Sequence, residues 1–181
     1  LAEALAARPC WSWLDWKVRA AILPVGYGPT EKALERLLEK KPRAVLMFGV
    51  AARRKAISIE MVARNRASRT QRDQSGRLPR TSALDDGPPM LKGRAPMRVL
   101  RDGMRHFGLP TTLSRNAGPY LCNAGYRFVL RRTSANIPVV FVHIPRVQRS
   151  GDARGLHFAP LLKGSEAIAR RLVLAARLSA R

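Results

Sequence analysis

The sequence predicts an α/β protein, a three-layer α/β/α sandwich around an open, mostly parallel, twisted sheet. Two continuous apolar runs of strand length, Ala44–Val50 and Pro138–Ile144, carry most of this prediction. Such runs are typical of strands that are buried on both faces, as in a parallel sheet covered by helices. A strand–helix–strand order over about thirty residues before Val50 also indicates a layered domain. We expect residues 1–181 to form a single domain.

The first fifty residues supply this strand–helix–strand unit. Leu1–Ala7 is expected to be the end of a helix, and Trp16–Val25 alternates apolar and charged side chains, which predicts a half-buried strand. After a turn at 26–29, Thr30 is the predicted N-cap of an amphipathic helix that ends before Pro42.

The rest of the chain contains a long irregular segment and five further elements. Residues 66–97 are rich in Arg, Pro, Gly, Asp and Ser and are predicted to form a long loop, which in a compact domain is functional or disordered. The expected elements are a short strand at 57–62, a helix at 96–107, a short strand at 111–114, a helix at about 120–132, and a last helix at 166–180 capped by Ser165.

The composition is that of a globular protein, but the charge is not ordinary. Lys and Arg total 34 against 12 Asp and Glu, a net charge of +22. A net charge this positive is typical of a protein that binds nucleic acid. The cations are nevertheless scattered along the chain, and only residues 52–80 are dense, with nine of them. Two interpretations stay open: a generic basic background, or a site for a polyanion.

Several classes are excluded or disfavoured. The apolar runs are shorter than the roughly 18–20 residues of a membrane span, and the first residues do not resemble a signal peptide. The two cysteines, Cys10 and Cys122, are too few for a disulfide scaffold or a thiolate metal site. We therefore expect a protein of the reducing cytoplasm, with no membrane association and no bound metal.

Three residues could do chemistry together. Cys122 lies just inside a predicted helix start, where backbone N–H groups favour a thiolate. His143 lies at the carboxyl end of a buried strand, where sites form in open α/β sheets, and Glu60 ends a second strand. They supply a nucleophile, a base and an orienting acid. Each also has a plainer interpretation, as a small buried side chain, a core histidine and a solvated partner of arginine.

The residues around these three resemble the pyroglutamyl peptidase I family of cysteine peptidases. The stretch from about 20 to 150 carries four matching blocks in the family's order. They are Phe48-Gly49-Val50-Ala51-Ala52-Arg53-Arg54; Ile57-Ser58-Ile59-Glu60 with Val62-Ala63, Asn65, Asp73 and Gly76; Ser114 with Ala117-Gly118 and Tyr120-Leu121-Cys122-Asn123; and Phe141-Val142-His143-Ile144-Pro145 with Gln148.

The resemblance implies a peptidase that removes pyroglutamate from the N-terminus of peptides, with no metal or organic cofactor. Cys122 would be the nucleophile, His143 its base and Glu60 the group that orients His143. The backbone N–H of Cys122 would stabilise the oxyanion. The resemblance also implies a lactam pocket formed by the backbone of Val50 and Ala51 and the side chains of Tyr120 and Leu121. Family members are often self-associated, so a homo-oligomer is implied as well.

The sequence departs from the family at three places. Nothing in Leu1–Asp15 resembles the family's first strand and pocket loop, so we expect a truncated N-terminus and an exposed sheet edge or groove. The family's oxyanion arginine is replaced by Thr70, with Arg69 and Arg72 as neighbours that could substitute for it. Family glycines that follow Ala51 are replaced by Ala52 and Arg53. An alternative hypothesis is a non-catalytic relative whose basic loop binds an acidic partner or nucleic acid.

Overall fold

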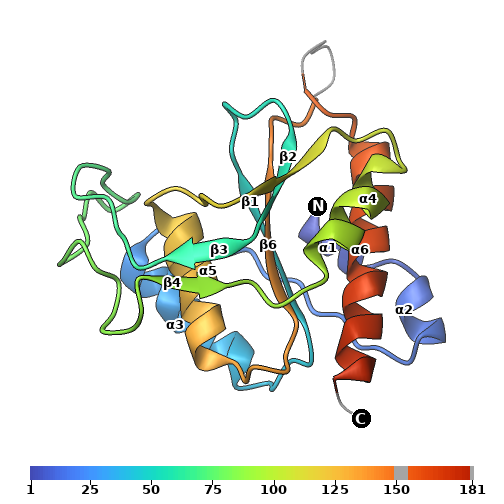
Figure 1. The fold of residues 1–181 in the computed structure, drawn as a ribbon, viewed down its shortest axis with the longest axis horizontal. Helices are drawn as coiled ribbons and strands as arrows, with labels where there is room; N and C mark the ends of the chain where they lie inside the picture. Colours follow the sequence, from blue (N-terminus) through green and yellow to red (C-terminus); the bar gives the residue numbers. More distant parts are fainter. Residues whose placement is uncertain (149–154, 180–181) are drawn as a thin grey trace.

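A four-stranded sheet with strand order β1-β6-β2-β5 forms the centre of the computed structural model, which describes residues 1–148 and 155–179 (Figure 1). The strands are β1 (Val45–Val50), β2 (Ile57–Glu60), β5 (Thr111–Ser114) and β6 (Val139–Ile144). β1 pairs with β6 and β2 pairs with β5 in parallel, whereas β2 and β6 are antiparallel. The predicted α/β class is confirmed, with a sheet that is mixed rather than wholly parallel.

Helices cover both faces of this sheet (Figure 1). On one face lie α3 (Tyr27–Leu38) and α5 (Leu121–Arg132), and on the other lie α4 (Met97–Arg105) and α6 (Phe158–Leu178). The remaining elements are the short helices α1 (Ala2–Ala6) and α2 (Cys10–Trp13) and a two-stranded ribbon of β3 (Val62–Arg64) and β4 (Met90–Lys92). In the described part of the chain, no helix has the length and apolarity to cross a membrane.

Alternation along the strands decides which side chains face α5. In β6, Val140, Val142 and Ile144 pack into the cluster built on α4 and α6, whereas Phe141 packs with residues of α5. Because successive side chains point to opposite faces, His143 shares the α5 side with Phe141. In β2, Ile57 and Ile59 pack toward α4 and α6, which leaves Glu60 on the α5 side.

The predicted strand over Trp16–Val25 is wrong. Residues 17–24 have no regular secondary structure, and the side chain of Ile22 is 78% exposed. Alternation of apolar and charged residues produces a strand only where a partner strand is available. β1 is an edge strand of the sheet, so within the described residues no strand pairs with its outer side.

Two helix starts also differ from the prediction. The helix assigned to Thr30 begins at Tyr27, with Gly26 as the N-cap, and the Thr30 hydroxyl donates to Pro24 O at 2.6 Å. The last helix begins at Phe158, so Ser165 is buried inside it rather than at its cap; the expected residue 180 lies outside the described residues.

The remaining predictions fit within small shifts. The strand expected at 57–62 is split at Met61 into β2 and β3, and the helix expected at 96–107 is α4. The predicted loop is irregular from residue 65 to 89, after which β4 and the start of α4 take its last part. The strand at Thr111–Ser114 has the predicted bounds.

Candidate active site

The three candidate residues come from three elements that meet on the α5 side of the sheet. Glu60 is the last residue of β2, His143 is the next-to-last residue of β6, and Cys122 is the second residue of α5. In the strand register, His143 lies opposite Gly49 of β1 and Ser58 of β2. Glu60 and His143 therefore come from the sheet, and Cys122 comes from the first turn of the helix.

Glu60 and His143 form a buried pair. His143 Nδ1 lies 2.7 Å from Glu60 Oε1, and the two residues are 4% and 0% exposed. When Nδ1 carries the ring proton, its N–H donates a hydrogen bond to the Glu60 carboxylate. Nε2 is then left free to accept a proton. The hydroxyl of Tyr126 donates to the backbone oxygen of Glu60 at 3.1 Å, which fixes the end of β2 against α5.

Arg54 is a further residue of the candidate site, and it was not among the site residues expected from the sequence. Its Nη1 donates to Glu60 Oε1 at 2.6 Å, and its Nη2 donates to Asn116 O at 2.7 Å. Burial acts to raise the pKa of Glu60, but the His143 hydrogen bond and the Arg54 charge lower that pKa below its ordinary value. The carboxylate is therefore held ionised beside the imidazole. The signal for Arg54 was its place in the matching block six residues before Glu60.

Cys122 is partly buried in the first turn of α5. Its Sγ would lie 2.9 Å from a Cβ added to Gly49, so the absence of a side chain at Gly49 makes room for the thiol. Burial, and next the charge of Glu60, raise the pKa of Cys122. These two effects outweigh the helix start that favoured a thiolate in the sequence analysis. Within the described residues, no hydrogen bond joins Cys122 to His143.

Asn123 is the second functional residue that the sequence analysis missed, although it follows the cysteine directly. It is fully buried, and its amide accepts from Arg64 N at 2.8 Å and donates to Arg64 O at 2.8 Å and Arg66 O at 3.0 Å. These bonds tie the end of β3 to the first turn of α5. A polar side chain that satisfies three backbone groups positions the chain on which it lies.

The four residues expected to form a lactam pocket lie at the end of β1 and directly before Cys122 in the chain. Val50 ends β1 and is 75% exposed, and Ala51 N donates to Ile144 O at 2.8 Å. Leu121 is buried next to Cys122. The Tyr120 hydroxyl donates to Arg72 O at 3.0 Å, and its ring meets that of Tyr27 edge to face at 6.2 Å.

The two arginines considered as oxyanion substitutes turn toward their own loop. Arg69 Nη1 donates to Arg80 O at 2.6 Å and Pro79 O at 3.2 Å, and Arg72 Nη1 donates to Gly76 O at 2.7 Å. Thr70, at the position of the family's arginine, lies with its hydroxyl 3.3 Å from that of Ser68. The backbone N–H groups in the first turn of α5, where Cys122 lies, remain as candidate donors to an oxyanion.

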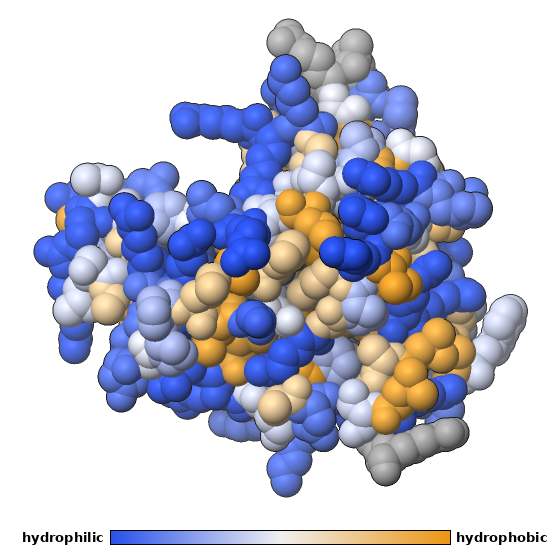
Figure 2. All heavy atoms as spheres, viewed as in Figure 1, coloured by the Kyte–Doolittle hydropathy of each residue, from blue (hydrophilic) through white to orange (hydrophobic). Residues whose placement is uncertain are grey.

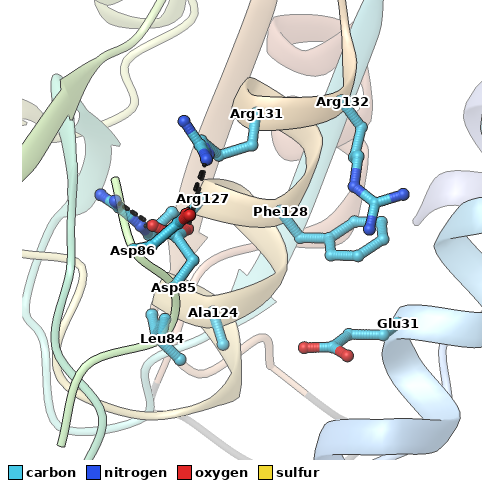
Figure 3. Close-up of a pocket in the computed structure, with 9 residues that line it drawn as sticks. All are labelled: Glu31, Leu84, Asp85, Asp86, Ala124, Arg127, Phe128, Arg131 and Arg132. Carbon is cyan, nitrogen blue, oxygen red and sulfur yellow. Dashed lines mark hydrogen bonds and ion pairs between the residues drawn. The ribbon is translucent and has the colours of Figure 1, made fainter. Parts of the chain in front are cut away.

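A separate cavity of about 270 Å³ lies between α3, α5 and the loop at 84–86 (Figure 3). Inside it, Arg127 Nε and Nη2 donate to the two oxygens of Asp85 at 2.8 and 2.6 Å, and Arg131 pairs with Asp86 at 3.1 Å. Its lining includes none of the predicted site residues. These ion pairs anchor the long loop to α5.

An α/β sandwich that brings a cysteine, a histidine and a carboxylate to one side of its sheet has the parts of a cysteine peptidase. Comparisons with known proteins agree. The sequence model of the family described as Pyroglutamyl peptidase matches residues 12–160. The chain therefore belongs to the pyroglutamyl peptidase family, a family of cysteine peptidases.

Individual relatives give the extent of the similarity. Pyrrolidone-carboxylate peptidase 1 of Caldanaerobacter subterraneus subsp. tengcongensis is 34% identical over 123 residues, which are 66% of this chain and 61% of that protein. The pyrrolidone-carboxylate peptidase of Gloeobacter violaceus is 31% identical over 160 residues, 83% of this chain and 78% of that one. The chain thus spans about three fifths of the length of the first of these relatives.

Solved structures agree with the fold. The pyrrolidone carboxyl peptidase from Thermus thermophilus has a TM-score of 0.74 at 32% identity, over 87% of this chain and 81% of that one. The pyroglutamyl peptidase I from Bacillus amyloliquefaciens has a TM-score of 0.82 over 95% of this chain and 86% of that one. At 21% identity, this second likeness concerns the fold alone.

Proposed function

We propose that this chain is a cysteine peptidase that removes N-terminal pyroglutamate from peptides, with Cys122, His143 and Glu60 as its catalytic residues. The observation that carries the proposal is the buried Glu60–His143 pair, 2.7 Å apart, on the side of the sheet where Cys122 begins α5. A carboxylate that binds Nδ1 selects the tautomer in which Nε2 can act as a base.

The first step is proton transfer from the thiol of Cys122 to His143 Nε2. Because no hydrogen bond joins the thiol to His143 within the described residues, this transfer requires the thiol to approach the imidazole when substrate enters. Catalytic hydrogen bonds are often long in a free enzyme and tighten in the complex. Glu60 then stabilises the imidazolium and the orientation of its ring, and Arg54 holds the Glu60 carboxylate in place.

The thiolate next attacks the carbonyl carbon that links pyroglutamate to the following residue. The oxyanion accepts the backbone N–H of Cys122, a contribution worth about 3–4 kcal/mol per donor in such sites. His143 returns its proton to the leaving amine, and a thioester remains on Cys122. A water that His143 deprotonates then attacks this thioester, and pyroglutamate leaves.

The substrate's lactam is small and neutral. We assign its pocket to the backbone of Val50 and Ala51, at the end of β1, and to Tyr120 and Leu121, which directly precede Cys122 in the chain. Both cysteines are free thiols, which supports the reducing cytoplasm as the compartment for this reaction.

Release of a fluorophore from its pyroglutamyl amide tests this function. We expect the purified chain to release it, and Cys122→Ser to lower the rate by about a thousandfold or more. Cys10→Ser is the matched control, because Cys10 lies in a separate cluster with Leu5, Trp11 and Val173. No release by the folded chain, or an unchanged rate in Cys122→Ser, would refute the proposed activity.

A further inference from the structure

The rim around Cys122 is formed by two segments that are hydrogen-bonded to the start of α5. The first is the loop at 64–72. It is bound on one side of Cys122 by Asn123, through Arg64 and Arg66, and on the other side by Tyr120, through Arg72. The backbone of this loop is therefore bound to the residues on both sides of Cys122 in the chain.

The second segment, residues 115–119, leads directly into α5. Arg54 Nη2 donates to Asn116 O at 2.7 Å, Arg64 Nε donates to Arg115 O at 3.3 Å, and Ser68 N donates to Pro119 O at 2.6 Å. The two segments are thus joined to each other as well as to the site, and they form one continuous rim.

This rim is strongly cationic. Within the described residues, none of its exposed arginines forms an ion pair, and the side chains of Arg64, Arg69 and Arg72 donate to backbone carbonyl oxygens. The residues concerned are Arg64, Arg66, Arg69, Arg72 and Arg115. Figure 2 shows hydrophilic side chains over the lobe that this loop forms.

The neighbouring acids do not neutralise the rim. Glu60 is fully buried and bound to His143 and Arg54, and Asp73 is 7% exposed and accepts from Ser75 and the backbone of Arg77. Asp85 and Asp86, further along the same loop, are paired with arginines of α5 (Figure 3). Within the described residues, the exposed arginines of the rim therefore carry positive charge that no ion pair offsets.

A substrate would bring its first charges to this rim. Pyroglutamate is neutral, so the side chains of the next two or three residues are the first that can be charged. An extended peptide rises about 3.3 Å per residue, which places those side chains within about 10 Å of the thiol. This is close to the screening length of about 8 Å at physiological ionic strength. Fields of this kind raise association rates by roughly 10- to 1,000-fold.

We propose that this rim selects pyroglutamyl peptides that carry acidic residues directly after the pyroglutamate. The inference rests on the proposed function and adds a substrate class to it. A single-stranded nucleic acid would match the charge, but such binding relies on aromatic side chains on which bases stack. Residues 64–89 include no aromatic residue, which favours an acidic peptide.

Three peptides test the selection: pyroglutamyl-Glu-Glu, pyroglutamyl-Ala-Ala and pyroglutamyl-Lys-Lys, with released pyroglutamate measured by chromatography. We expect kcat/KM for the Glu-Glu peptide to exceed that for Lys-Lys by about tenfold or more at low salt, and the ratio to shrink as salt rises. The double variant Arg66→Glu/Arg115→Glu, at two exposed arginines of the rim, should remove the preference. Arg98→Glu/Lys163→Glu, with the same charge change on exposed residues of α4 and α6, should keep it.

The outcomes separate the two proposals. If the wild type cleaves all three peptides equally, the selection is refuted while the proposed function stands. If it cleaves none, the proposed function fails, and binding of the three peptides with a C-terminal fluorophore to Cys122→Ser, measured by anisotropy, still decides the selection. Tighter binding of the Glu-Glu peptide supports it; equal binding, or displacement of that peptide by a much lower concentration of oligothymidylate, overturns it.

Discussion

Arg54 donates a hydrogen bond of 2.6 Å to Oε1 of Glu60, the same oxygen that His143 Nδ1 meets at 2.7 Å. The guanidinium also reaches Asn116 O in the turn that leads to α5. One side chain thus links the acid of the site to the segment that carries the nucleophile. Its double contact depends on the forked geometry of guanidinium, which a lysine cannot reproduce.

Replacing Arg54 should damage catalysis more than folding. We expect Arg54→Met to lower kcat/KM by about ten- to a hundredfold, since hydrogen bonds to charged groups are worth about 1.5–3 kcal/mol. Arg54→Lys should recover part of this loss. Without the cation, the pKa of Glu60 rises, so the acid limb of the pH profile should move to higher pH in Arg54→Met. An unmoved acid limb would show that Arg54 does not act through Glu60.

Glu60 should make stability dependent on pH on the acid side. Burial works against ionisation, yet hydrogen bonding by His143 and the charge of Arg54 bring its pKa below the ordinary value of 4.5. A lowered folded-state pKa contributes stability above the unfolded pKa, and this is lost as pH falls through the folded value.

Urea unfolding from about pH 5 to about pH 3 measures this contribution. The free energy of unfolding of the wild type should fall more steeply than that of Glu60→Gln, and the exposed Glu39→Gln should follow the wild type. Parallel curves for the wild type and Glu60→Gln would contradict the assignment.

Gly49 should tolerate no side chain. An added Cβ would lie 2.7 Å from Phe141 Cζ and 2.9 Å from Cys122 Sγ, closer than ordinary contact. We expect Gly49→Ala to lose about 1–3 kcal/mol of stability and most of its activity, because the thiol must move. Gly28→Ala, where no atom lies within 4 Å of the added Cβ, is the control for thermal melting and turnover. Equal activity in the two variants would contradict the close approach.

Asn123 should contribute to stability through the backbone groups that it satisfies. Asn123→Ala leaves Arg64 N and the oxygens of Arg64 and Arg66 without this partner. We expect a loss of about 1–3 kcal/mol in chemical denaturation, together with lower activity. The exposed Asn136→Ala should unfold like the wild type. If both variants unfold alike, the hydrogen bonds of Asn123 between β3 and α5 do not contribute to the free energy of unfolding.

The buried strands were the most predictable part of the fold. Apolar runs predicted both β1 and β6, and β6 is buried along its whole length as expected. β1 lies at the sheet edge and is only partly buried, so the expectation of burial on both faces is wrong for that strand. Trp16–Val25 failed because its alternation describes a half-buried surface and says nothing about whether a partner strand exists. Thr30 failed as a cap because its hydroxyl bonds back to Pro24 O from inside the first turn of α3. Ser165 lies inside α6, where its buried hydroxyl has no hydrogen-bond partner among the described residues.

At the site, sequence patterns indicated which residues carry chemistry but not what surrounds them. Glu60 and His143 lie 83 positions apart, and their contact follows from the antiparallel pairing of β2 with β6, which no local pattern encodes. The role of Arg54 was hidden in a basic stretch, since its contacts rather than its type distinguish it from Arg53. The raised pKa of Cys122 likewise depends on tertiary burial.

Trapping the acyl-enzyme shows whether Cys122 is the nucleophile. The chain is mixed with p-nitrophenyl pyroglutamate, quenched in acid, and digested, and the modified peptide is identified by mass spectrometry. We expect a pyroglutamyl thioester on Cys122 and none on Cys10, and we expect this thioester to form more slowly in His143→Gln. Hydrolysis with no adduct on Cys122, or an adduct that forms equally fast on Cys10, would contradict it.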